Sequence, residues 1–103
     1  MYKRQRLTLI EEAVGRIGLQ TTPVANQGGA LTIPYAGVVY DAEGGTWTFV
    51  ELDPRVYQRA PITIDRVDGG TAVLSTGPQA GTAVVTVGAA ELVGVEAGIS
   101  GGE

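Results

Sequence analysis

Glycine and proline interrupt the apolar runs of this chain at close intervals, so long regular elements are excluded from most of it. The 103 residues include 16 glycines and 5 prolines. Short apolar runs bounded by residues that favour turns predict short strands joined by tight turns. No apolar run approaches the roughly 20 residues that a helix needs to cross a bilayer. A chain of this length is expected to form one domain with a single modest core.

Antiparallel strands are predicted between residues 30 and 87. The stretches that are apolar and β-branched lie at 30–40, 46–52, 56–67, 71–76 and 82–87. The connections at 41–45 and 68–70 contain Asp and Gly, which tolerate positive φ and therefore suit hairpins. A third turn is predicted at 53–55, where Pro54 presets φ.

Residues 6–24 change to a helical period. Thr8 and Glu11 have the spacing of a capping box, in which a hydroxyl and a carboxylate satisfy free amides of the first turn. Gly18 suits the left-handed conformation that ends a helix. Apolar residues recur three and four positions apart between these points: Leu9, Ile10, Ala13, Val14 and Ile17. We predict a helix at 8–17, which is too short to be stable unless it packs on a sheet.

The pattern of residues 62–67 indicates which faces of the predicted sheet are buried. Ile62, Ile64 and Val67 alternate with polar residues there, as in a sheet with one buried and one wet face. We therefore expect a mainly β fold: a small, twisted antiparallel sheet or partly open β-barrel of about six or seven strands, with one short α-helix near the N-terminus. Residues 1–95 are predicted to form the single domain, and residues 96–103 a flexible C-terminal tail.

The charge and the missing residue types argue against several functions. The net charge is −4, whereas proteins that bind nucleic acid present a basic surface to the phosphates. The chain has no cysteine and no histidine, so it lacks the commonest ligands of transition metals and the commonest general base. We expect no metal site, no cofactor, no nucleic-acid partner and no direct membrane span.

Catalysis is not expected either. Neither Ser75 nor Ser100 has a histidine to activate it, and the sole lysine, Lys3, is close to the N-terminus. Helix-dipole placement or turn formation explains three pairs of carboxylates: Glu11 with Glu12, Asp41 with Glu43, and Asp65 with Asp68. We therefore predict that the chain is not an enzyme and has no catalytic residues.

Five stretches, taken in order, resemble one known family. They are GLQTTPV at 18–24, IPYAGVVY at 33–40, TWTFV at 46–50, QRAPITI at 58–64 and GPQAGTAVVTVG at 77–88. Together they resemble the C-terminal, membrane-proximal β-domain of periplasmic adaptor subunits, also called membrane fusion proteins, of resistance-nodulation-division efflux systems. Full-length members also contain a lipoyl-like domain and usually an α-helical hairpin, for which residues 25–29 leave no room.

The resemblance implies a non-catalytic module of the cell envelope that docks with another protein, as an adaptor-like accessory to an efflux or export transporter. It also implies an extracytoplasmic location, on the periplasmic or cell-surface side, and makes a homo-oligomer plausible. Two alternatives stay open at this point. One is an extracytoplasmic module that binds a small molecule or an ion, and the other is a structural domain taken from a longer adaptor protein.

The aromatic residues on neighbouring predicted strands allow two interpretations. They form core and cross-strand pairs in the first. In the second, Trp47 or Tyr57, together with Arg59, forms an exposed anchor for a partner protein, because Trp, Tyr and Arg dominate interface hot spots. In the family that the chain resembles, the Arg at the place of Arg59 is structural. Trp47, Tyr57 and Arg59 are the candidate partner-contact residues.

Overall fold

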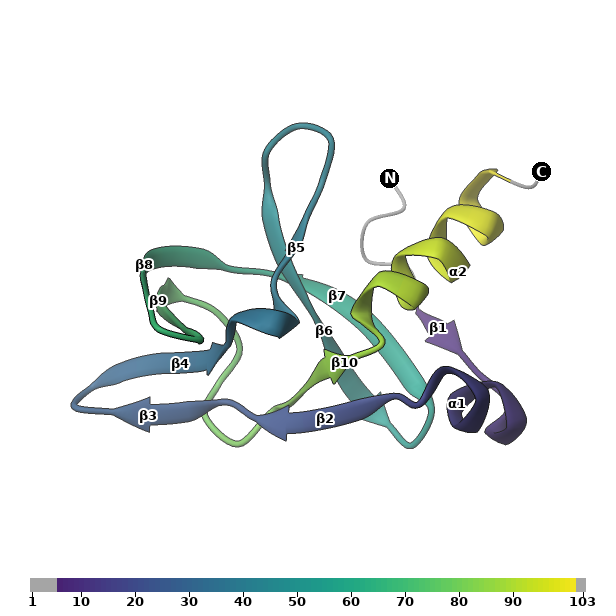
Figure 1. Ribbon diagram of the computed structural model, residues 1–103, viewed down its shortest axis with the longest axis horizontal. Coiled ribbons are helices and arrows are strands. Elements are labelled where there is room, and N and C mark those ends of the chain that lie inside the picture. The colour runs from purple at the N-terminus through teal and green to yellow at the C-terminus, as the bar shows by residue number, and fades with distance from the viewer. Residues whose placement is uncertain (1–5, 102–103) are drawn as a thin grey trace.

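The computed structural model describes residues 6–101, and the side chains of residues 6–97 (Figure 1). This part is mainly β, as predicted, with ten strands and two α-helices. The strands are β1 (Leu7–Thr8), β2 (Gln20–Pro23), β3 (Ala25–Gln27), β4 (Ala30–Pro34), β5 (Val39–Tyr40), β6 (Thr46–Asp53), β7 (Val56–Pro61), β8 (Thr63–Asp68), β9 (Thr71–Thr76) and β10 (Ala83–Val87). The helices are α1 (Glu11–Ile17) and α2 (Ala89–Gly101), and a 3-10 turn, η1 (Tyr35–Gly37), precedes β5.

The strands form two antiparallel sheets. The six-stranded sheet has the order β1-β7-β6-β10-β2, with β5 also paired to β6, and the four-stranded sheet has the order β3-β4-β9-β8. Both sheets have free end strands within the described residues, so neither closes into a barrel. The strands outnumber the expected six or seven because residues 7–27 supply β1, β2 and β3, and because the stretches 30–40 and 56–67 are each divided in two.

The six-stranded sheet is the middle layer of the molecule. Its helix-side core comprises Leu7, Leu9, Val39, Phe49, Tyr57, Val85, Ala89 and Leu92. Its strand-side core, against the four-stranded sheet, comprises Val24, Ile33, Val50, Ile62, Ala72, Leu74 and Val84. Successive residues of β6 and β10 therefore enter opposite cores, which explains why these strands are apolar at consecutive positions. The molecule has two cores rather than the expected one because both faces of this sheet are covered.

The chain passes between the two sheets at two buried residues. Val24 joins β2 to β3, and Ile62 joins β7 to β8; their exposed fractions are 2% and 5%. The N–H of Val24 donates to Thr82 O at 2.8 Å and its carbonyl accepts from Gly81 N at 2.8 Å. Thr46 accepts the N–H of Ile62 through its carbonyl at 3.1 Å and donates its hydroxyl to the Ile62 carbonyl at 2.7 Å. Both crossings therefore bury backbone whose polar groups are satisfied.

A glycine explains why the stretch 30–40 is not one strand. Gly37, at the end of η1, lies directly against β10, and a Cβ atom there would be 3.0 Å from the carbonyl oxygen of Val85. Only glycine permits this approach without displacement of the backbone. The 3-10 turn brings the chain onto the middle sheet, and β5 then continues as a partner of β6.

The N-terminal helix exists, but it begins later than predicted. Thr8 lies in β1, where it pairs with Val56, and the N-cap position is occupied by Ile10 without any side-chain hydrogen bond. The capping box at Thr8 and Glu11 is therefore wrong, because pairing with β7 holds Thr8 in an extended conformation. The helix ends as predicted: Gly18 has φ 77° and its N–H donates to Val14 O.

The C-terminal region is the largest departure from the predictions. Residues 89–101 form α2, so a flexible tail from Glu96 is wrong for residues 96–101, and residues 102–103 lie outside the described part. Packing of Ala89 and Leu92 in the helix-side core stabilises a helix that its glycines disfavour. Within residues 6–101, neither α2 nor α1 is long and apolar enough to cross a membrane.

Candidate functional site

The three residues predicted as partner contacts come together, but inside the protein. Trp47 is on β6, Tyr57 and Arg59 are on β7, and all three face the helix layer. Tyr57 is 2% exposed and Arg59 is 8% exposed. The prediction that these two residues form an exposed anchor is therefore wrong: strand alternation turns them toward the face that α2 covers. Trp47 is half-buried against the same core.

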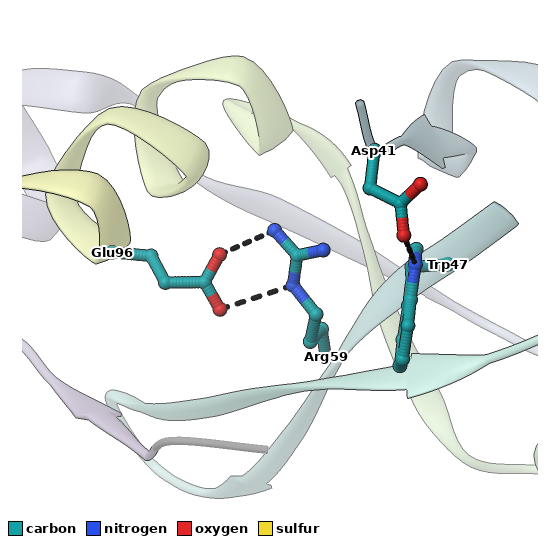
Figure 2. Close-up of polar contacts among 4 residues, drawn as sticks. All are labelled: Asp41, Trp47, Arg59 and Glu96. Carbon is teal, nitrogen blue, oxygen red and sulfur yellow. Dashed lines mark hydrogen bonds and ion pairs between the residues drawn. The ribbon is translucent and has the colours of Figure 1, made fainter. Parts of the chain in front are cut away.

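Arg59 forms a buried ion pair with α2. Its Nε donates to Glu96 Oε2 at 3.0 Å and its Nη2 donates to Glu96 Oε1, so the guanidinium holds the carboxylate with two parallel bonds (Figure 2). The guanidinium carbon also lies 5.3 Å from the centre of the Trp47 ring and 5.7 Å from the centre of the Phe49 ring. The charge of Arg59 is thus compensated by a carboxylate and by two ring faces.

Sequence reasoning missed Glu96, the partner of Arg59. Ala89, Leu92 and Glu96 are spaced three and four residues apart, and all are less than 9% exposed. An acidic residue in register with apolar residues on a helix is a signal for a buried charge. Arg59 is a charged residue inside a predicted apolar strand, which indicates a buried charge of the opposite sign on the sheet.

Trp47 links this cluster to the β5–β6 loop. Its Nε1 donates to Asp41 Oδ2 at 2.8 Å (Figure 2). Asp41 Oδ1 accepts the backbone N–H groups of Glu43 at 2.9 Å and Gly45 at 2.6 Å. A Cβ atom at Gly45 would be 2.7 Å from Asp41 Oδ2, so any other residue there would displace the Asp41 carboxylate. Asp41 is therefore a structural turn residue, as predicted, and it also orients Trp47.

Tyr57 lies at the far end of the same core. Burial, followed by the negative charge of Glu51 and a hydrogen bond to it, raises the pKa of the Tyr57 hydroxyl. The Tyr57 side chain is therefore held neutral over a wide pH range. It acts as a core residue with a polar tip rather than as a reactive group.

The exposed aromatic residues are a different pair. Tyr35 and Tyr40 are 39% and 57% exposed, and their hydroxyl groups are 2.8 Å apart. This hydrogen bond to Tyr35, with smaller effects of desolvation and charge, raises the pKa of Tyr40. Tyr35 begins η1 and Tyr40 ends β5, so the pair brackets the segment 36–39.

An apolar groove lies where this segment meets α2. It has a volume of about 300 Å³ and is lined by Ala36, Val38, Val39, Ala89, Ala90 and Val93. The two elements that supply most of the lining are labelled in Figure 1, where β5 rises into its hairpin loop and α2 lies to the right of it. Every lining side chain is aliphatic, so this surface offers burial of apolar area and no chemistry.

Two of the carboxylate pairs noted in the sequence lie on separate elements. Glu11 and Glu12 occupy the first turn of α1, whereas Asp65 and Asp68 lie on the exposed strand β8. Within residues 6–97, no group of three Asp or Glu side chains could hold a metal ion. The expectations of no enzyme activity and no cofactor stay predictions.

The chain matches no protein-family model, no curated protein and no solved structure. The resemblance to adaptor proteins therefore stays a prediction. It is carried by the five stretches quoted from the sequence, all of which lie within the two sheets and their connections.

Proposed function

We propose that this chain is a non-catalytic docking module that binds another protein of the cell envelope, as an adaptor-like accessory to an efflux or export transporter. The observation that carries the proposal is the apolar groove between the segment 36–39 and α2, with the exposed Tyr35–Tyr40 pair beside it in the sequence. Exposed apolar grooves and exposed tyrosines are both typical of protein interfaces.

The construction of the groove supports a docking role. One wall is α2, which the Arg59–Glu96 ion pair holds on the middle sheet. The other wall is anchored by Gly37 against β10 and continues into the loop that Asp41 organises. A groove with fixed walls loses little conformational entropy on binding, which favours affinity.

By the resemblance, the partner is the extracytoplasmic part of a transporter or a second envelope protein, and the chain itself is extracytoplasmic. A homo-oligomer is compatible with the open end strands of both sheets. The mechanism is shape-complementary burial of apolar surface, so no cofactor is needed.

Site-specific photo-crosslinking in the native organism tests the proposal. A benzoylphenylalanine at exposed Ala90, in the groove, is expected to crosslink to an efflux or export transporter that mass spectrometry identifies. The same probe at exposed Ala80, in the connection between β9 and β10, is the matched control. Equal crosslinking from both positions, or none to any envelope protein from Ala90, would contradict the docking function.

A further inference from the structure

The outer face of the four-stranded sheet carries a second groove, which is polar. It has a volume of about 220 Å³, and its lining includes Gln27, Thr32, Arg66, Asp68, Thr71 and Val73. These residues come from all four strands of the sheet. The opposite face of the same sheet packs in the strand-side core, so the polar groove and the apolar groove lie on different layers of the molecule.

A β-bulge places two charges in this groove. Ile64 pairs with Leu74 and Arg66 pairs with the next residue, Val73, so Asp65 is an extra residue in β8. Without the bulge, Ile64, Arg66 and Asp68 would share one face. With it, Ile64 packs on the strand-side core while Arg66 and Asp68 line the groove. Bulges that redirect side chains are common next to functional sites.

One residue of β8 departs from the sequence-based assignment because β8 is an edge strand of its sheet. Val67, which the alternation assigned to the buried face, is 48% exposed at the edge of the sheet. The residues at the centre of the outer face are, by contrast, more buried than their position on that face predicts. Thr32 and Val73 are only 6% and 7% exposed although they face away from the core. The sheet is therefore concave on this side, and its floor is shielded from solvent.

Both charges at the rim are available to a ligand. Arg66 contacts Asp65 at 3.4 Å, but the two side chains are 64% and 60% exposed, so this surface pair is weak. Within residues 6–97, the Asp68 carboxylate has no ion pair or side-chain hydrogen bond. Arg66 and Asp68 are two residues apart on a regular part of the strand, which separates their Cα atoms by about 6.7 Å.

We propose that the polar groove binds a small zwitterion of the α-amino-acid type. The guanidinium of Arg66 would hold the carboxylate with two parallel bonds, and the Asp68 carboxylate would accept the ammonium group. The hydroxyl groups of Thr32 and Thr71 supply further hydrogen bonds, and Val73 offers a small apolar floor. In an α-amino acid the ammonium nitrogen and the carboxylate carbon are bonded to the same carbon, so two side chains that rise from one strand two residues apart can reach both groups.

The lining argues against other ligand classes. No aromatic ring lines the groove, so sugars and nucleobases would lack a stacking surface. The lining offers one guanidinium and one carboxylate, which is too little charge of either sign to favour a polyanion or a divalent cation. The proposal does not rest on the docking function, because it concerns another face.

Titration of the ¹⁵N-labelled chain with glycine, L-alanine and acetate, followed by NMR, tests the site. The amide signals of Thr32, Thr71 and Val73 are expected to shift and saturate with both amino acids. Arg66→Gln is expected to weaken binding of all three probes at least about tenfold, and Arg66→Lys, which keeps the charge but loses the fork, to weaken it less. Asp68→Asn is expected to weaken only the two amino acids. Arg16→Gln, on exposed α1, is the matched control.

Three results would overturn the proposal. They are an absence of saturating shifts at the three amides, amino acids that bind no more tightly than acetate, and amino-acid binding that Asp68→Asn leaves unchanged. Ala90→Arg, in the apolar groove, is expected to leave amino-acid binding intact, so failure of the docking function and failure of this site are distinguishable.

Discussion

The helix-side core and the strand-side core lie on opposite faces of one sheet, yet they are closed by different interactions. The helix-side core contains aromatic rings and is sealed by α2, whose position is fixed by the Arg59–Glu96 ion pair. The strand-side core is wholly aliphatic, and backbone crossings at Val24 and Ile62 connect its two sheets. The helix α2 is held on the sheet by its side chains. The four-stranded sheet is instead held by the backbone, because single residues connect it directly to strands of the six-stranded sheet.

This difference predicts where each core is vulnerable. A buried ion pair fixes geometry, but it is costly to break because one charge is then left without a partner. An aliphatic core loses transfer energy and gains a cavity when it is truncated, without an uncompensated charge. Substitutions that separate these two mechanisms measure how independent the two cores are.

Glu96→Ala is expected to have the largest effect, with a loss of about 3–5 kcal/mol in the free energy of unfolding, because it leaves the Arg59 guanidinium buried and unpaired. Urea denaturation measures the loss, and hydrogen exchange is expected to rise first in α2. The double variant Arg59→Met with Glu96→Leu is the control, and it is expected to recover most of the stability. A double variant no more stable than Glu96→Ala would contradict this account of the helix-side core.

Leu74→Ala is expected to lower the free energy of unfolding by about 2–4 kcal/mol, since a side chain that is 3% exposed is truncated in the strand-side core. The same denaturation experiment measures it. Hydrogen exchange is expected to rise in β4 and β9, the strands paired around this residue, with little change in α2. Equal increases in α2 and β9 would show that the two cores respond as one unit.

Thr48→Val is expected to have the smallest effect, and the opposite sign. Thr48 is 0% exposed, and in the described part of the chain its hydroxyl has no hydrogen-bond partner. Replacing this hydroxyl with a methyl group removes a buried unsatisfied group, so a gain of about 1 kcal/mol is expected. Thermal unfolding measures the change, with Thr21→Val, on exposed β2, as the control. A loss of stability would imply a partner for this hydroxyl.

The local patterns predicted the strands well wherever turns bound them. The loops at 41–45, 53–55 and 68–70 are the turns that the sequence predicted, although in the second of them positive φ falls on Arg55 (66°). Thr8 and α2 could not be predicted in this way, because long-range packing decides both. Pairing with β7 overrides the capping signal of Thr8, and the helix-side core overrides the glycine content of α2.

The sequence predicted which residues of the candidate site share a face, but not that they are buried. Trp47, Arg59 and Tyr57 do share one face of the β6–β7 hairpin, since cross-strand register follows from the turn, but only Arg59 lies against Trp47. Burial of the helix-side face of that hairpin depends on α2, which was not predicted as a helix from the sequence. The apolar groove requires the same helix for one wall, so it could not be predicted either.

The place of β10 has a consequence for the order in which the protein forms. Among the strands of residues 6–101 this one comes last in sequence, yet it lies between β6 and β2 in the middle sheet. During synthesis, β6 and β2 therefore keep unpaired edges until residues 83–87 have left the ribosome. Such edges can pair with another chain, so the growing polypeptide is most prone to aggregate in the interval before β10 is inserted.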